Sequence, residues 1–154
     1  MTIKDIVSRQ REYFNTHETK SVAFREAALK NLQRAIIRDE SKIFDALKKD
    51  LNKSDFESYM SEVGMVLEEL RYSMKNMRKW ARIKKVPTPL AQFHAKSFVV
   101  AEPYGIVLIM SPWNYPFQLC MAPLIGAIAA GNCAVIKPSA YAPHTSRAIA
   151  ELIG

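Results

Sequence analysis

Apolar side chains recur every three or four positions over the first half of the chain, which predicts a run of helices. Thr2 is a suitable N-cap for a first helix that extends to about Phe14, and Ser21 is a suitable N-cap for the second. The third helix is expected to end where Asn52-Lys-Ser-Asp55 breaks the pattern. The apolar positions of the second and third helices are Phe24, Ala28, Leu32, Ile36, Ile43, Leu47 and Leu51.

The fourth predicted helix carries the longest apolar stripe of the chain. Its members are Tyr59, Val63, Val66, Leu67, Leu70, Met74 and Met77. Methionines and aromatic residues at this spacing are typical of a packed core rather than of a cofactor site. The prolines of Pro87-Thr-Pro89 are then expected to end the helical part as a stiff linker, and Lys96–Ala101 is expected to form a strand.

The pattern changes in the last third, where two short β-branched runs flank an apolar helix. Gly105–Met110 and Ala134–Ile136 predict strands that are buried on both faces. Gln118–Ala130 is apolar nearly throughout and stops at Gly131, a residue type common just after helices. A strand, a helix and a strand so closely spaced predict parallel pairing through a right-handed crossover. A last helix is expected over Thr145–Ile153.

Candidate chemistry lies where these two strands end. The sharp bend Ser111-Pro-Trp-Asn-Tyr-Pro-Phe117 follows the first strand, and Lys137-Pro-Ser139 follows the second. Because turns after parallel strands face the ligand crevice, we expect the bend and Lys137 to share one edge of the sheet. Taken alone, Asn114 beside a proline is a typical turn former, and Lys137 is a typical solvated strand end. A role in chemistry is the alternative for each.

Composition agrees with an ordinary globular protein, since 49% of the residues are hydrophobic and 24% are charged. The opening Met1–Ile6 is too polar for a signal peptide, and the longest apolar region, Leu119–Ala130, is too short to span a bilayer. These features favour a cytoplasmic protein with no membrane segment. Cys120 and Cys133 lie in apolar sequence and are expected to be buried, inert thiols.

A net charge of +7 raises the question of nucleic-acid binding. One dense basic cluster surrounds Trp80 and consists of Arg78, Lys79, Arg82, Lys84 and Lys85. No zinc-ligand spacing, helix-turn-helix signal or RNP motif accompanies it. The favoured interpretation is therefore a solvated helix end, with neither a nucleic-acid partner nor a metal site.

Three segments, taken in their order and spacing, resemble the aldehyde dehydrogenase superfamily. They are Pro103–Phe117, with Trp-Asn-Tyr-Pro-Phe directly after a hydrophobic strand, then Pro123–Asn132 and Ile136–Ser139. The first is specific, whereas the apolar helix alone would be weak evidence. The N-terminal helices and Lys85-Val-Pro-Thr-Pro-Leu90 resemble the class 3 branch in particular.

The resemblance covers the whole chain and implies an α/β fold that is incomplete within it. Residues 1–86 would form an N-terminal helical segment, and residues 87–103 a linker with an oligomerisation-type strand. Residues 104–154 would form the first βαβα part of a Rossmann-like dinucleotide-binding domain. An exposed strand edge of this kind predicts a homodimer for the full-length protein.

The resemblance also implies oxidation of an aldehyde to a carboxylic acid, with NAD or NADP as cofactor and a cysteine thioester as intermediate. Asn114 matches the residue whose amide donates to the developing oxyanion. The matching cofactor groove is lined by backbone groups of the segment from Met110 through Ser111 and Pro112 to Trp113. Lys137 matches a residue that contacts the adenosine ribose, and Ser139 lies close by.

Several parts of that machinery are expected to lie beyond this chain: a glycine-rich turn, a glutamate base and the nucleophilic cysteine. The 154 residues alone are therefore predicted to be inactive. The alternative is a truncated, non-catalytic remnant that acts as a binding or dimerising module. One departure concerns the cofactor, because Ala140 stands where the family often has a glutamate that bonds the ribose. Its absence predicts that NADP is tolerated at least as well as NAD.

Overall fold

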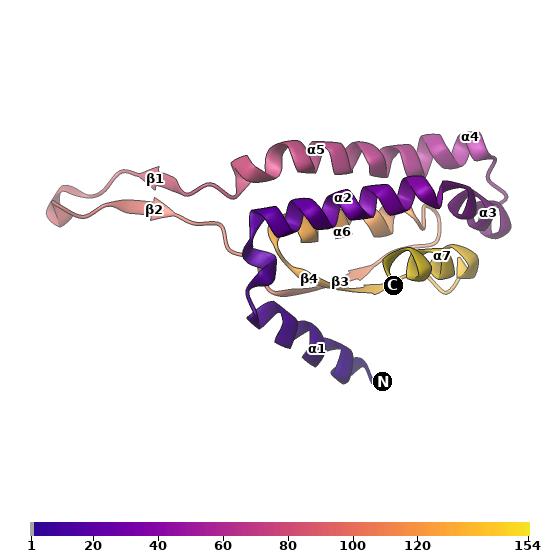
Figure 1. Ribbon diagram of the computed structural model, residues 1–154, viewed down its shortest axis with the longest axis horizontal. Coiled ribbons are helices and arrows are strands. Elements are labelled where there is room, and N and C mark those ends of the chain that lie inside the picture. The colour runs from indigo at the N-terminus through magenta and orange to yellow at the C-terminus, as the bar shows by residue number, and fades with distance from the viewer. Residues whose placement is uncertain (1) are drawn as a thin grey trace.

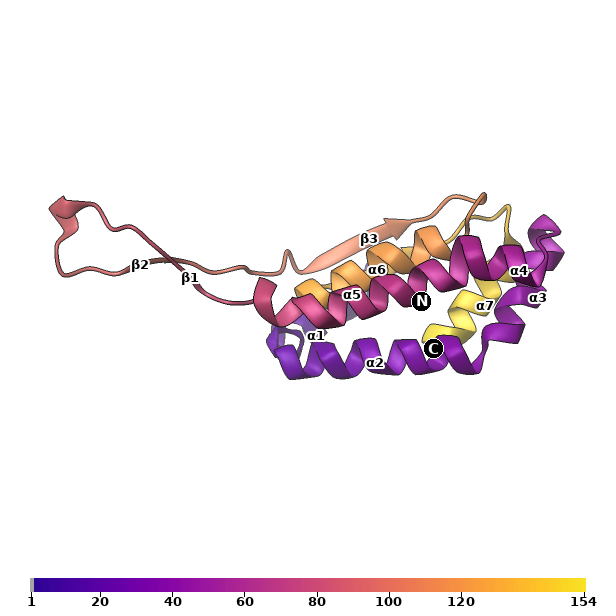
Figure 2. The ribbon, with the colours of Figure 1, turned by 90° about the horizontal axis from the view of Figure 1, so that it is seen from above.

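Residues 2–154 are described by a computed structural model, in which helices pack over a two-stranded parallel sheet and a thin hairpin projects from one end (Figure 1). Helix α1 lies on one side of that sheet. Helices α2, α5 and α6 lie on the other side, as the same view shows. The hairpin extends well away from the rest of the molecule (Figure 2).

The first three helices end where local sequence signals place their ends. They are α1 (Ile3–Asn15), α2 (Val22–Arg38) and α3 (Glu40–Leu51), with a 3₁₀ turn at Glu18–Lys20. Thr2 and Asp5 form a reciprocal capping box, and the Ser21 side chain accepts a hydrogen bond from the Phe24 amide. Asn52 ends α3 in the left-handed region, with φ of 54°. The predicted caps at Thr2 and Ser21 and the break after α3 are thereby confirmed.

The fourth predicted helix is interrupted by a π-helical turn. It consists of α4 (Asp55–Ser58), the π turn η2 (Tyr59–Val63) and α5 (Gly64–Trp80). Val63, Val66, Leu70 and Met77 are buried as expected. Tyr59 was expected on the same stripe but is 45% exposed. That prediction was wrong because a wider turn shifts the register by which residues face the core.

The projecting hairpin, here called the arm, comprises β1 (Lys84–Val86) and β2 (Ser97–Val99), with a 3₁₀ turn at Leu90–Gln92 between them. The strands pair antiparallel, with Lys85 opposite Phe98. The strand expected over Lys96–Ala101 exists but is shorter. Its partner strand, β1, begins at Lys84, before the linker that was expected at Pro87. Lys84 and Lys85, which were expected at a solvated helix end, belong to this strand instead.

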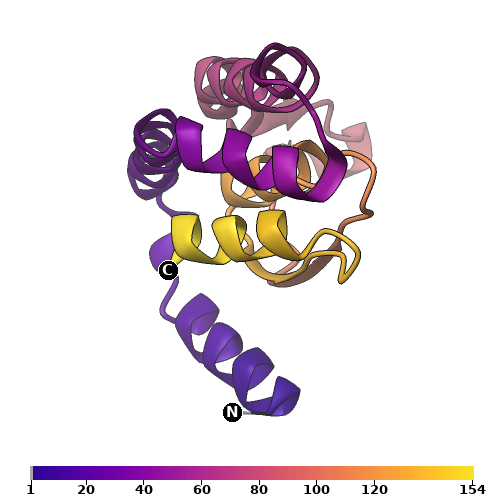
Figure 3. The same ribbon diagram turned by 90° about the vertical axis from the view of Figure 1, so that its right-hand side faces the viewer.

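The last third forms the predicted strand–helix–strand–helix order. Its elements are β3 (Ile106–Met110), α6 (Gln118–Ala130), β4 (Cys133–Lys137) and α7 (Pro143–Ile153). β3 and β4 pair in parallel, which confirms the prediction, and Gly131 ends α6 with φ of 87°. Helix α7 starts two residues before the expected Thr145, because a proline at its first turn fits the helical φ. It packs beside α3, as the end-on view shows (Figure 3).

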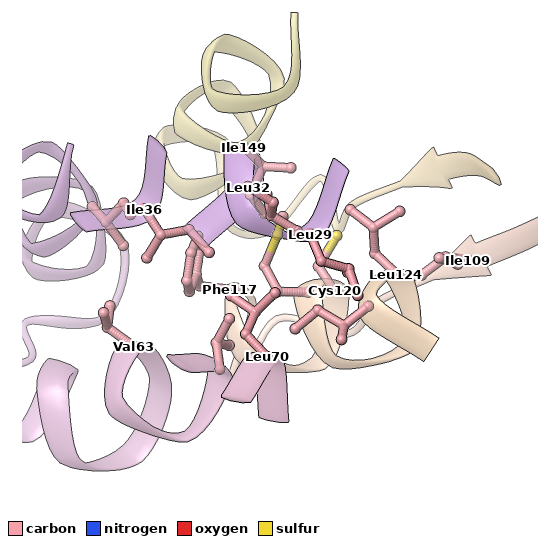
Figure 4. Close-up of a cluster of buried hydrophobic side chains, with 14 of the residues drawn as sticks. Leu29, Leu32, Ile36, Val63, Leu70, Ile109, Phe117, Cys120, Leu124 and Ile149 are labelled. Carbon is pink, nitrogen blue, oxygen red and sulfur yellow. The ribbon is translucent and has the colours of Figure 1, made fainter. Parts of the chain in front are cut away.

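One hydrophobic core joins the helical layer to the sheet. Leu29 and Ile36 from α2, Leu70 from α5, and Phe117 and Cys120 at α6 meet within it (Figure 4). The strands are not buried on both faces, contrary to expectation: Leu108 and Met110 of β3 are 62% and 67% exposed. Helix α1 contacts both strands but covers only part of that face.

Candidate functional site

The candidate site lies at the edge of the sheet where β3 and β4 end. Met110 is the register partner of Lys137, and the Ser111 amide donates to the Lys137 carbonyl at 3.3 Å. The prediction that the bend and Lys137 share one edge is therefore confirmed. Carboxyl ends of parallel strands are the usual place of ligands in open α/β sheets.

The bend between β3 and α6 presents its middle to solvent and buries its ends. Ser111 at its start is 7% exposed, and Phe117 at its end is fully buried. Trp113 is 54% exposed, and Asn114 is exposed as well. The side chain of Asn114 therefore stands on a short loop that is fixed at both ends.

Two residues of the helical layer, Glu62 and Lys53, contact the backbone of the bend. Glu62, which is fully buried, accepts hydrogen bonds at Oε2 from the Phe117 amide at 2.8 Å and the Gln118 amide at 3.2 Å. Lys53 donates to Oε1 of Glu62 at 2.5 Å and to the Asn114 carbonyl at 3.3 Å. Its ammonium also lies 4.2 Å from the centroid of the Tyr115 ring.

Sequence reasoning missed both of these residues. A signal was present for Glu62, because it falls between Tyr59 and Val63 on the apolar stripe, where a carboxylate is expensive unless it is paired. Lys53 gave no comparable signal, since it follows the helix-ending Asn52 and looks like an ordinary loop lysine.

The second turn of the site, after β4, is held by local hydrogen bonds. The Lys137 side chain is exposed at the strand end, whereas Ser139 is 8% exposed. The Ser139 hydroxyl accepts from the Tyr141 amide at 3.2 Å, and its carbonyl accepts from the Ser146 hydroxyl at 2.9 Å. Ser139 thus shapes the turn, and the Lys137 side chain stands exposed beside it.

A carboxylate from α3 caps the helix that follows this turn. Asp50 accepts from the His144 amide at 3.1 Å, and from the amide and hydroxyl of Thr145 at 2.7 and 2.8 Å. Thr145 lies inside the first turn of this helix, and its buried hydroxyl donates to Asp50 rather than capping the helix.

Both thiols are free and buried, as predicted. Burial raises the pKa of Cys120 above its usual range, although the neighbouring Ser111 hydroxyl opposes that rise. Burial likewise raises the pKa of Cys133. Since the thiolate is the reactive form, neither cysteine is suited to act as a nucleophile.

The chemistry available at this edge is hydrogen-bond donation by Asn114 and the binding of an anion by Lys137. The Asn114 amide is a donor that does not titrate, which suits an oxygen that gains negative charge. The exposed Met110, Trp113 and Lys137 offer apolar surface and one cation across adjacent strand ends. That combination can bind a ligand that carries both an apolar part and an anionic part.

Comparison with known proteins agrees with this arrangement. The family described as "Aldehyde dehydrogenase family" matches residues 1–154. The chain is 49% identical over 141 residues to 4,4'-diaponeurosporen-aldehyde dehydrogenase of Staphylococcus aureus, which covers 92% of this chain and 31% of that protein. It is 41% identical over 149 residues to aldehyde dehydrogenase family 3 member B1 of Bos taurus, which covers 97% of this chain and 32% of that one.

Solved structures give the same result. The substrate-bound state of Staphylococcus aureus AldH superposes with a TM-score of 0.96 at 46% identity, covering 99% of this chain and 33% of that one. Succinic semialdehyde dehydrogenase from Streptococcus pyogenes, in complex with NADP+, shares the fold with a TM-score of 0.84 at 20% identity, covering 99% and 33%. This chain thus spans about a third of the length of the relatives it matches. No helix among residues 2–154 is both long and apolar enough to cross a membrane.

Proposed function

The chain belongs to the aldehyde dehydrogenase family, and on that premise we propose that it is the N-terminal part of an NAD- or NADP-dependent enzyme that oxidises an aldehyde to a carboxylic acid. One observation carries the proposal. Asn114 stands exposed on a bend anchored at both ends, at the same strand edge as Lys137. The catalytic cysteine and glutamate of the family lie outside these residues, so the chain alone is expected to be inactive.

Asn114 is assigned the stabilisation of the oxyanion. When a nucleophile attacks the aldehyde carbonyl, negative charge develops on its oxygen, and a fixed amide N–H strengthens its hydrogen bond as the charge grows. An asparagine keeps this donor at any pH, because its amide does not titrate. Its fixed position matters because a donor that is already in place needs no reorganisation during the reaction.

The edge around Asn114 is assigned to the cofactor. Backbone groups from Met110 through Ser111 and Pro112 to Trp113 would line its groove, Lys137 would reach a ribose or phosphate oxygen, and Ser139 would hold the turn beside it. A bound dinucleotide supplies the hydride acceptor of the reaction. Tolerance of NADP, expected from Ala140, stays a prediction.

The arm supports a second element of the proposal, a homodimer in the full-length protein. Leu90 and Phe93 near its tip are 87% and 74% exposed, and Phe98 and Val99 on β2 are 59% and 55% exposed. Apolar side chains so exposed on a two-stranded hairpin are typical of a surface that another chain covers. The same observation favours the alternative, a non-catalytic dimerising module. A cytoplasmic location also stays a prediction.

The proposal is tested by replacing Asn114 in the full-length dehydrogenase that carries this sequence. Asn114→Ala removes the donor, and we expect kcat to fall about a hundredfold or more, because loss of one such donor typically costs about 2.7–4 kcal/mol of barrier. Asn114→Asp keeps the size but replaces the donor with a negative acceptor, so we expect at least as large a loss. Steady-state aldehyde oxidation measures both.

A matched control is Asn76→Ala, which removes a half-buried asparagine whose amide donates to the Tyr72 carbonyl within α5. It should leave kcat within about twofold of the wild type, as surface changes usually do. Wild-type turnover in Asn114→Ala would exclude the assignment. Absence of aldehyde oxidation in the wild-type full-length protein would favour the dimerising module instead.

A further inference from the structure

We propose that Glu62 and Lys53 are positioning residues that hold the Asn114 bend in its reactive orientation from the helical layer. This inference rests on the role of Asn114 proposed above. Lys53 lies on the α3–α4 loop and Glu62 lies in the π turn, whereas the bend follows β3. The helical segment therefore contacts the strand–helix segment at Asn114, the residue assigned to oxyanion stabilisation.

Glu62 supplies a helix cap that α6 lacks. The first amides of a helix have no partner within it, and Phe117 at the N-cap position has no side-chain acceptor to offer. Oε2 of Glu62 accepts from the Phe117 and Gln118 amides, at 2.8 and 3.2 Å. A carboxylate also suits the positive end of the helix dipole. Glu62 thus fixes where α6 starts, and with it the end of the bend.

Lys53 connects that cap to Asn114 itself. The Lys53 ammonium bonds Oε1 of Glu62 at 2.5 Å and the Asn114 carbonyl at 3.3 Å, and it lies over the Tyr115 ring. These contacts restrain the peptide bond after Asn114 and the side chain of the next residue. Rotation of the Asn114 backbone would move its amide group away from the position where it donates, and Lys53 opposes that rotation.

The π turn explains how a carboxylate reaches this place. In the π turn Tyr59–Val63, Tyr59 is partly exposed and Glu62 is buried. Gly64 follows this turn, and any larger residue there would clash, because its Cβ would lie 2.8 Å from the Tyr59 carbonyl oxygen. Single π turns inside helices are frequent at functional sites.

Stability alone is a poor explanation for this pair. Burying two charges is costly, and well-packed apolar residues in place of a buried ion pair are often neutral or stabilising. The Glu62 side chain is fully buried and that of Lys53 is 8% exposed, so both are removed from water. Their contacts converge on the bend, at Asn114, Tyr115, Phe117 and Gln118, which favours a role in holding it.

The test measures kinetics and amide exchange in the full-length dehydrogenase. Glu62→Gln keeps the side-chain shape but removes the charge that pairs with Lys53. We expect kcat to fall about tenfold, as small displacements of catalytic groups do, with KM changed less than about twofold. Amide hydrogen exchange over residues 115–118 should become about tenfold faster, while exchange in β4 stays unchanged.

A double-mutant cycle separates positioning from general weakening. If Glu62 acts through Asn114, adding Glu62→Gln to Asn114→Ala should lower kcat by less than about twofold further. Glu26→Gln is the matched control, since it likewise removes the charge of a glutamate that pairs with a cation, Arg78 of α5, but has no contact with the bend. It should leave kcat within about twofold of the wild type.

Lys53→Met provides a second variant if Glu62→Gln does not fold, and Lys53→Arg should recover most of the activity that Lys53→Met loses, because it keeps the cation. A wild-type kcat in Glu62→Gln, or losses that are fully additive with Asn114→Ala, would overturn the inference. So would equal kcat values for Lys53→Arg and Lys53→Met. A wild-type kcat in Asn114→Ala alone would instead overturn the proposed function, so the two failures are distinguishable.

Discussion

The body and the arm of this molecule use apolar residues in opposite ways. In the body, Leu29, Ile36, Leu70 and Ile125 are fully buried between helices from both halves of the chain. In the arm, Leu90 and other apolar side chains stand in solvent, and each strand has three residues. Two-stranded hairpins are marginal by themselves in water.

This difference indicates where each region obtains its stability. The body is stabilised by contacts inside this chain, since its core side chains are removed from water, although Leu108 and Met110 of β3 remain exposed. The arm has little of its own to bury, and in the homodimer proposed above a second chain would cover its exposed apolar side chains. Its contribution is therefore expected in assembly rather than in folding.

The largest expected effect is on the free energy of unfolding, when a leucine is replaced by alanine once in the body and once in the arm. Leu29→Ala removes a fully buried side chain from the core and should lower the free energy of unfolding by about 2–5 kcal/mol, because a cavity is left behind. Leu90→Ala removes an 87% exposed side chain and should change it by less than about 0.5 kcal/mol. Urea denaturation of the two variants measures both values. Equal losses would show that the arm is part of the folded core, and the comparison would fail.

A smaller effect is expected when the arm is tested for assembly. Phe98→Ser on β2 should weaken self-association of the full-length protein about tenfold or more, as loss of a buried aromatic contact does. The melting temperature at low protein concentration should stay nearly unchanged. Ile37→Ser, which alters an exposed apolar residue on α2, is the matched control and should leave association unaffected. Analytical ultracentrifugation over a range of concentrations measures the constants. Unchanged association in Phe98→Ser would remove the arm from the interface.

The smallest expected effect concerns the charged surface of the body. Hydrogen bonds from Arg38 and then Lys42 lower the pKa of Asp39 from 3.8 to about 2. A carboxyl group with a depressed pKa stabilises the folded state above its ordinary pKa, and this contribution is lost as the pH falls through the folded value. The melting temperatures of the wild type and Asp39→Asn should therefore differ slightly at pH 5 and converge towards pH 2. A difference that persists at pH 2 would contradict the assignment to this ionised group.

Much of the fold could be predicted because its signals are local. The caps at Thr2 and Ser21, the break at Asn52 and the stop at Gly131 each depend on neighbouring backbone groups, and the structure confirms them. The parallel pairing of β3 and β4 followed from their short separation. The exposure of Tyr59 could not be predicted, because a π turn has no reliable local signature.

The candidate site was predicted in part. The sequence placed Asn114 and Lys137 after two strands, and the sheet register brings those strand ends together. Their assigned roles rest on the family resemblance and on the proposed function. The contacts of Glu62 and Lys53 with the bend were missed, because these residues lie more than fifty positions before it in the sequence.

The sequence by itself determined which segments become helices and strands, where most of them end, and which residues stand at the strand ends. Hydrogen bonds between near neighbours and the period of apolar positions are enough for that. Only the tertiary structure decided how the helices after each strand are capped. Glu62 and Asp50 reach α6 and α7 from a distant part of the chain, because burying α3, the π turn and α6 against one core brings their polar groups into hydrogen-bonding distance.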